Sequence, residues 1–86
     1  MPKTVHSARQ RRLIEVLVRS REKAGLTQSQ VAKALKRHQP FISSIESGHR
    51  RIDLIELMDI TDILGADIHD IIRELHRLPG LKPVRK

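Results

Sequence analysis

The sequence has no cysteine, tryptophan or tyrosine, and its only aromatic residue is Phe41. Without cysteine, neither a disulfide nor a cysteine-based metal site can form, which fits a reducing compartment, and we expect a cytoplasmic protein. A lone aromatic residue cannot build the row of stacking side chains that single-strand binders use, and the same shortage argues against RNA recognition.

Also missing is any apolar run that approaches the roughly 20 residues of a membrane span. The basic N-terminal residues lack the apolar core of a secretory signal. There is no glycine-rich phosphate loop and no strand–turn–helix context for a Ser-His-Asp site. His69 and His76 are seven residues apart on one expected helix, whereas a helical metal pair has a four-residue spacing. We therefore expect no enzyme, no metal site, no cofactor and no membrane partner.

Positive charge predominates and is distributed unevenly. The formal net charge is +7; residues 1–52 contain 12 Lys or Arg against 3 Asp or Glu, while residues 53–78 contain 2 against 7. This division predicts one face turned towards a polyanion and another turned away from it. Nucleic acid is the first candidate partner, and an anionic lipid surface remains an alternative on charge alone.

Apolar residues recur at three- and four-residue spacing and the alternation typical of strands is missing, so we predict an all-α fold. Capping residues, and glycine or proline at helix ends, delimit five segments. The expected N-caps include Ser7, Thr27, Asp53 and Asp67, and the expected terminators are Gly25, Gly48, Gly65 and Pro79. The helices are expected over about residues 7–24, 27–35, 39–47, 53–64 and 67–78.

A chain of 86 residues is expected to form one domain. We expect a flexible N-terminus over residues 1–6, a compact five-helix bundle over residues 7–78 and a short, mobile, basic tail over residues 79–86. The expected apolar or inward-facing positions are Leu13, Leu17, Arg21, Ala24, Val31, Ala32, Leu35, Ile42, Ile45, Leu54, Leu57, Met58, Ile60, Leu64, Ile68, Ile71, Ile72, Leu75 and Leu78. The last two helices carry more apolar surface than a small core needs, notably at Ile55, Met58, Ile63 and Leu78, which indicates a self-complementary dimer contact.

The middle of the chain contains a set of residues whose types and spacings together form a characteristic pattern. They are Arg21, Gly25-Leu26-Thr27-Gln28, Ala32, Gln39, Ile42-Ser43, Glu46, Gly48, Leu57, Ile60 and Leu64-Gly65. In this pattern the chain resembles the phage-repressor helix-turn-helix family, which is Cro/cI-like and often called XRE-like. The resemblance covers about Leu13 to Leu75, most of the chain.

The resemblance implies a five-helix bundle that binds operator DNA as a dimer, with the third helix in the major groove. It implies that Gln39 contacts a base, since an amide can pair bidentately with adenine. Gln28 corresponds to a phosphate-contacting glutamine, and Arg21 and Glu46 correspond to a charged pair between the first and third helices. The following loop, with His49, Arg50 and Arg51, is implied to grip phosphate.

The residues themselves add further candidates around the same helix. Ser43 and Ser44 have short hydroxyls that permit a close approach to bases or phosphates. Arg37 and His38 lie in the expected turn between the second and third helices, and Thr27 caps the second helix; all three are candidate DNA contacts as well. Pro40 stands where some family members carry a base-reading polar residue, so it can only shape the backbone or touch a methyl group, and base readout should be sparse.

Phe41 admits two readings. It is either a core or boundary residue or a contact to a thymine methyl group. The surrounding charged and polar residues could also form an ordinary solvated surface. The combined motif argues against that alternative.

We therefore predict a sequence-specific, double-stranded-DNA-binding transcription regulator that represses by occupying an operator. It is expected to act as a homodimer and to insert the helix at about residues 39–47 into the major groove. Two alternatives stay open: an antitoxin-type regulator, and a protein-interaction module that uses the acidic helices over residues 53–78.

Overall fold

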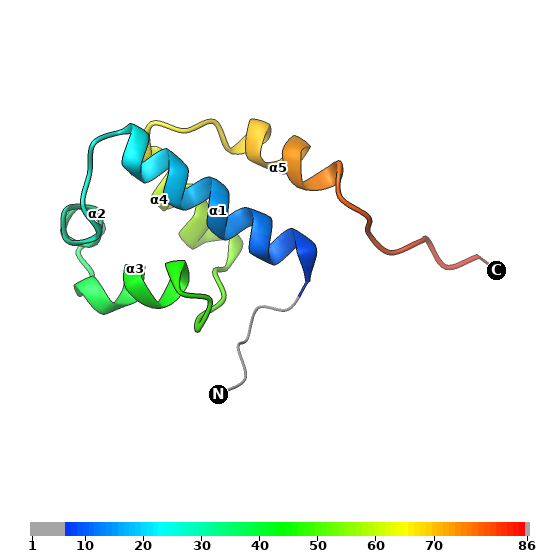
Figure 1. The fold of residues 1–86 in the computed structure, drawn as a ribbon, viewed down its shortest axis with the longest axis horizontal. Helices are drawn as coiled ribbons and strands as arrows, with labels where there is room; N and C mark the ends of the chain where they lie inside the picture. Colours follow the sequence, from blue (N-terminus) through cyan, green and yellow to red (C-terminus); the bar gives the residue numbers. More distant parts are fainter. Residues whose placement is uncertain (1–6, 86) are drawn as a thin grey trace.

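A computed structural model describes residues 7–85, so the flexible segment expected over residues 1–6 lies outside the described residues. Within that range the chain forms five helices and no strand (Figure 1). The helices are α1 (Ala8–Lys23), α2 (Gln28–Ala34), α3 (Gln39–Glu46), α4 (Leu54–Leu64) and α5 (Ile68–His76). The all-α, five-helix prediction is confirmed, and the largest difference is that α5 ends at His76 rather than at residue 78.

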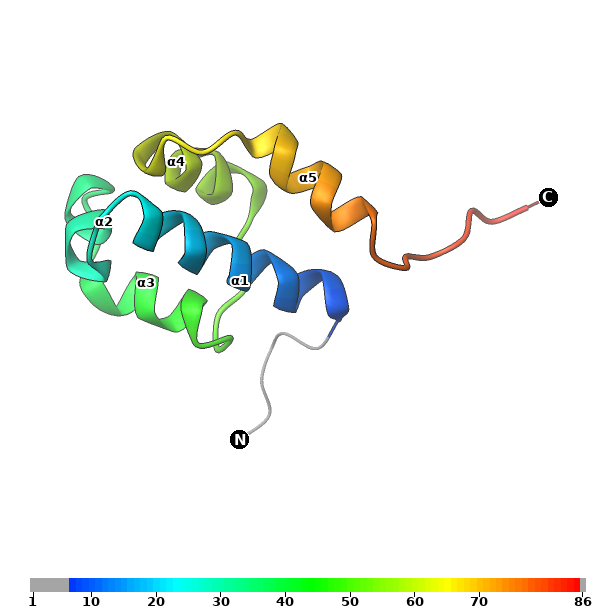
Figure 2. The same cartoon turned by 45° about the horizontal axis from the view of Figure 1, so that its top comes forward.

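The longest helix, α1, lies at the centre of the bundle, with α3 on one side and α5 on the other (Figures 1 and 2). Helix α2 packs mainly against α3, and α4 lies against α2 and α5. After α5, the chain passes the Arg9 side chain of α1 at Gly80, and the following residues up to 85 extend away from the helices without secondary structure. The site of interest is therefore the α2–α3 end of a bundle in which α1 is the common support.

Four of the five helices, α1, α2, α4 and α5, begin at a residue whose side chain accepts from a free N–H of the first turn. Thr27 starts a capping box in which its hydroxyl accepts from Gln30 N at 3.1 Å and the Gln30 side chain accepts from Thr27 N at 2.8 Å. Asp53 and Glu56 form the same arrangement at the start of α4. Because these motifs depend on residues three apart, the sequence alone was enough to place both helix starts.

The turn between α2 and α3 contains no glycine. Lys36 takes the left-handed backbone conformation there, with φ of 59°. Residues other than glycine rarely adopt this conformation. At the end of α3, Gly48 has φ of 83° and supplies the left-handed residue without that penalty, as the sequence predicted. The two turns fix how α3 enters and leaves the bundle.

The core is one apolar cluster to which every helix contributes. It consists of Leu13, Val16, Leu17, Val31, Ala32, Ile42, Ile45, Leu57, Ile60, Leu64 and Ile71. Thr61 is also buried, and its Oγ1 lies 3.0 Å from the carbonyl oxygens of both Leu57 and Met58. This contact to its own helix satisfies the hydroxyl, so a polar residue fits the core.

The structure corrects part of the expected core. Leu54 is 62% exposed, and Ile72 and Ala24 are exposed as well, whereas Met58, which was expected among the surplus apolar residues, is 46% exposed in agreement. Met58 follows the buried Leu57 by one residue, which turns its side chain about 100° away around the helix. Helix α4 therefore has an apolar stripe that is exposed to solvent, next to the apolar stripe that is buried in the core.

Helix α5 is fastened to α1 by charge as well as by apolar packing. Glu74 accepts from Arg12 Nη1 at 3.3 Å and from Arg19 Nη2 at 3.4 Å. The three side chains range from partly to mostly exposed, so each pair contributes at most about 1 kcal/mol. Most of the attachment of α5 therefore comes from apolar packing such as that of the buried Ile71.

Candidate nucleic-acid interface

Helix α3 presents a polar face to solvent because its opposite face is buried. Ile42 and Ile45 pack in the core, and Pro40 lies in the first turn of the helix, where an N–H is not needed. A helix of 3.6 residues per turn then places the remaining side chains on the outer side. These are Gln39, Pro40, Ser43, Ser44 and Ser47, of which the two inner serines are half-buried.

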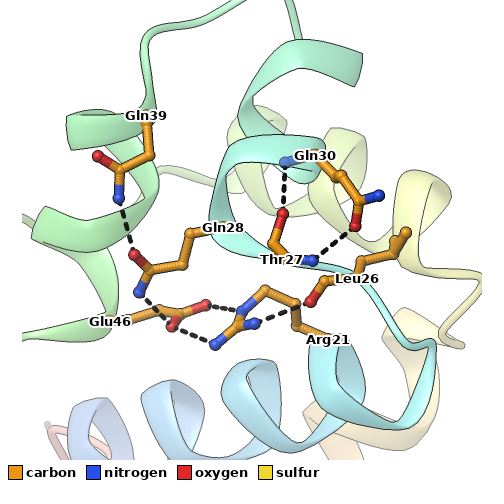
Figure 3. A network of polar contacts seen from close by, with 7 residues as sticks. All are labelled: Arg21, Leu26, Thr27, Gln28, Gln30, Gln39 and Glu46. Atoms are coloured by element: carbon orange, nitrogen blue, oxygen red, sulfur yellow. Dashed lines mark hydrogen bonds and ion pairs between the residues drawn. The ribbon is translucent and has the colours of Figure 1, made fainter.

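A partly buried ion pair supports α3 from behind. Glu46 accepts from Arg21 Nε at 2.7 Å and from Nη2 at 3.0 Å, and Arg21 Nη1 also donates to Leu26 O at 2.8 Å (Figure 3). The side chains are 15% and 10% exposed. The hydrogen bonds to Glu46 raise the pKa of the Arg21 guanidinium, against the opposing effect of burial. The pair ties α1, the α1–α2 turn and α3 together.

Two glutamines extend this pair to the surface. Gln28 Nε2 donates to Glu46 Oε1 at 2.9 Å, and Gln39 Nε2 donates to Gln28 Oε1 at 2.8 Å (Figure 3). A carboxylate only accepts hydrogen bonds, so Gln28 must turn its amide nitrogen towards Glu46 and its oxygen towards Gln39. The orientation of the exposed Gln39 amide is thus set by a chain of contacts that begins at Arg21.

The candidate phosphate ligands Arg37 and Arg50 already have partners within the protein. Arg50 donates to both oxygens of Glu56, at 3.0 and 2.9 Å, and Arg37 Nη2 donates to Glu56 Oε2 at 3.2 Å. Both guanidinium groups lie on the Phe41 ring, with Cζ 4.1 Å and 4.6 Å from its centroid. We call Arg37, Phe41, Arg50 and Glu56 the Phe41 cluster.

Electrostatics within the Phe41 cluster follow from these contacts. The hydrogen bonds from Arg50 lower the pKa of the Glu56 carboxyl; burial works in the opposite direction, and the backbone N–H of Asp53 lowers it further. The same bonds raise the pKa of Arg50. Phe41 is half-buried, as the boundary reading of the sequence expected, but its contact with two arginines was not predicted.

The other candidates lie around the ends of α3. His38 is the exposed N-cap residue, with no capping bond from its side chain, and Ser43 Oγ donates to Pro40 O at 3.3 Å. His49 Nδ1 lies 2.7 Å from Ser47 Oγ, and Arg51 is exposed.

The Thr27 hydroxyl accepts the capping bond of α2 and the residue is exposed, so its O–H can still donate to a phosphate. Ser47 was missed, although it follows Pro40 by seven residues, a spacing that predicts the same face.

The described residues contain no cluster of three or more potential metal ligands. In the same part of the chain, no helix combines the length and apolar character needed to cross a bilayer.

A short helix, a tight turn and a second helix with an outward polar face define a helix-turn-helix protein. A family model for the helix-turn-helix matches residues 17–71. This chain belongs to the XRE-type helix-turn-helix family, which consists of DNA-binding transcription regulators.

The chain is similar to an XRE-family-like protein from Pseudomonas syringae pv. tomato, with 38% identity, 86% of this chain and 90% of that chain covered, and a TM-score of 0.79. It shares its fold with the clp gene regulator ClgR from Corynebacterium glutamicum, with 22% identity, 88% and 94% coverage and a TM-score of 0.72. The restriction-modification controller protein C.Esp1396I has the same fold, at 22% identity, 84% and 94% coverage and a TM-score of 0.73. A search of curated proteins found no match.

Proposed function

We propose that this chain binds double-stranded DNA sequence-specifically, with α3 in the major groove, and regulates transcription by occupying an operator. The observation that carries the proposal is the exposed Gln39 amide, held by Gln28 and Glu46 on the outer face of α3. One N–H of Gln39 is used in this contact. Among the described residues, no hydrogen bond uses its carbonyl oxygen or its second N–H, which together match the acceptor and donor that adenine presents in the major groove.

Direct readout around Gln39 is sparse in this proposal. Ser43, Ser44 and Ser47 are short, so α3 can lie deep in the groove and donate single hydrogen bonds to bases or phosphates. Pro40 offers only apolar contact, which suits a thymine methyl group. Sequence-dependent DNA shape would supply part of the discrimination, since few side chains reach base edges.

Phosphate contacts would position the helix and supply most of the affinity. The proposed ligands surround α3 at both ends, and the positive charges of the arginines among them give binding that weakens steeply as salt rises. They are Thr27, Gln28, Arg37, His38, His49, Arg50 and Arg51. Arg37 is about half exposed and uses one N–H in its bond to Glu56, which leaves other donors for a phosphate.

A homodimer would place two copies of α3 on one operator. Leu54, Ile55, Met58, Ile63 and Ile72 are exposed apolar residues of α4 and α5, which lie next to each other. An apolar surface of this kind commonly marks an association site, and a two-fold pair of such surfaces closes on itself. Two recognition helices would then contact half-sites about one helical turn of DNA apart.

Selection of bound fragments from random duplex DNA tests the proposal in one experiment. We expect enrichment of a two-fold symmetric motif, loss of preference at particular positions with Gln39→Ala, and an unchanged motif with Gln10→Ala in the first turn of α1. Recovery of unenriched random sequences would contradict specific recognition. Failure to retain any duplex at low salt would favour an interaction module instead.

A further inference from the structure

Glu56 is the most heavily used carboxylate at the flank of α3. Its Oε1 accepts from Asp53 N at 3.1 Å and Arg50 Nη1 at 3.0 Å, and its Oε2 accepts from Arg50 Nη2 at 2.9 Å and Arg37 Nη2 at 3.2 Å. The Glu56 side chain is 13% exposed. One carboxylate thus gathers arginines from the turn before α3 and from the loop after it.

The ring of Phe41 gives this gathering a defined geometry. Both guanidinium groups lie on the ring while both also bond to Glu56, so ring and carboxylate together restrict where each group can point. Arg50 additionally donates to Arg51 O at 2.7 Å. Two cations are therefore held close together at a surface that borders the recognition helix.

The two arginines keep exposed donors. Both share the Glu56 carboxylate as their ion-pair partner, and the Arg37 and Arg50 side chains are 47% and 38% exposed. The charge of Asp53 acts on Arg50 and Asp59 lines the same pocket as Arg37, so exposed guanidinium donors, rather than net positive charge, are what remains for an anion. A DNA phosphate diester presents two anionic oxygens in a geometry that a guanidinium fork binds as it binds a carboxylate. A phosphate bound by these groups would therefore use guanidinium donors that Glu56 engages in the free protein.

We propose that Arg37 and Arg50 form a single backbone-phosphate site whose occupant in the free protein is the Glu56 carboxylate. A DNA phosphate replaces Glu56 as partner of one or both arginines, and this exchange lowers the sequence-independent part of the affinity. The proposal rests on the DNA-binding function above. It makes Glu56 an internal competitor that restrains binding to duplexes of any sequence.

The first test compares two variants, each of which removes one negative charge from α4 at a different position. Glu56→Gln keeps a side-chain oxygen for the capping bond to Asp53 N but faces the arginines with an amide. Asp62→Asn changes an exposed residue that makes no ion pair with a described residue. We expect Glu56→Gln to bind random-sequence duplex roughly threefold to tenfold more tightly at low salt, with a salt slope steeper by about one unit, and Asp62→Asn to stay near the parent.

Adding Arg37→Gln to Glu56→Gln should cancel most of the gain, because the released group is then absent. Equal tightening by both charge variants would reduce the effect to net charge and overturn the proposal. Unchanged or weaker binding by Glu56→Gln would also overturn it, since Glu56 would then organise the arginines for phosphate rather than compete. Circular dichroism melting checks that each variant is folded.

Two further measurements test the anion site separately from DNA binding and test the exchange without a variant. Elution from immobilised heparin reports arginine access to a polyanion without DNA recognition. Later elution of Glu56→Gln than of Asp62→Asn, with no duplex binding by any variant, would sink the proposed function and leave the anion site standing. In the parent protein, adding duplex should move the ¹³C signal of the Glu56 carboxyl; a static signal on saturation with bound DNA would refute the exchange even if the variants failed to fold.

Discussion

Glu46 accepts a 2.7 Å hydrogen bond from Arg21 Nε and, through its other oxygen, a 2.9 Å hydrogen bond from Gln28 Nε2. One carboxylate therefore joins the support of the bundle to the residue that orients Gln39. Stability and recognition share a side chain here, and the consequences of breaking it can be separated by measurement.

Replacing Glu46 with alanine should lower the free energy of unfolding by about 3 kcal/mol, because Arg21 would keep its charge in a partly buried place without its partner. Urea denaturation of the parent and variant measures the difference. Glu22→Ala, on an exposed neighbour of Arg21, is the control and should stay within about 0.5 kcal/mol of the parent. A Glu46→Ala midpoint equal to that of the control would show that the pair contributes nothing to stability.

Replacing Gln39 with alanine should flatten discrimination among DNA sequences while leaving the melting temperature within a few degrees of the parent, since the side chain is exposed. Gln28→Ala should act in the same direction more weakly, because it frees the Gln39 amide to rotate without removing it. Competition binding with operator variants gives the loss at each base pair, expected at about 1–3 kcal/mol where Gln39 contacts the base. Undiminished discrimination in both variants would place readout elsewhere.

Much of this arrangement could be predicted from the sequence because it is local. The capping boxes at Thr27 and Asp53 and the left-handed glycine at residue 48 depend on neighbours within four residues, and the helix boundaries followed from them. The Arg21–Glu46 contact spans 25 residues and was expected only through the family resemblance.

The Phe41 cluster could not be predicted in this way. Arg37 and Glu56 are 19 residues apart and meet because the loop after α3 brings the first turn of α4 back to the turn between α2 and α3. No periodic pattern in the sequence indicates that contact. From the sequence alone, Arg37 and Arg50 were therefore interpreted as solvent-exposed phosphate ligands. The exposed Leu54 was likewise misplaced, because an apolar residue at helical spacing gives no sign of which of two adjacent stripes is buried.

Arg51→Ala should weaken binding to every duplex sequence and reduce the salt slope by about one unit, as expected for the loss of one phosphate contact. Binding constants measured over a range of salt concentrations, on operator and random duplexes side by side, give the slope for each. A selective loss on the operator alone would instead assign Arg51 to base readout. An unaltered slope on both duplexes would remove it from the interface.

The contribution of Glu56 to stability should depend on pH with a definite sign. Its pKa in the folded protein lies below the ordinary value of 4.5, mainly because of the hydrogen bonds from Arg50, so the folded state favours the ionised form. The resulting stabilisation is complete above about pH 4.5 and is lost as the pH falls through the folded-state pKa. The stability difference between the parent and Glu56→Gln should accordingly be constant near neutrality and shrink below pH 4.5; a difference that grows on acidification would contradict this assignment.

The apolar stripe on α4 makes a prediction about assembly. Ile55 is 63% exposed and lies beside Leu54, so an aspartate at position 55 would set a charge inside a two-fold apolar contact and disfavour association. Ile55→Asp should sediment as a monomer at concentrations where the parent is a dimer, and it should lose operator affinity because the two half-sites are then bound independently. Leu81→Asp, an equally apolar and fully exposed change in the tail, is the matched control and should leave the sedimentation unaltered. If the tail variant dissociated and the α4 variant did not, the contact would belong to residues 79–85 and the stripe on α4 would need another partner.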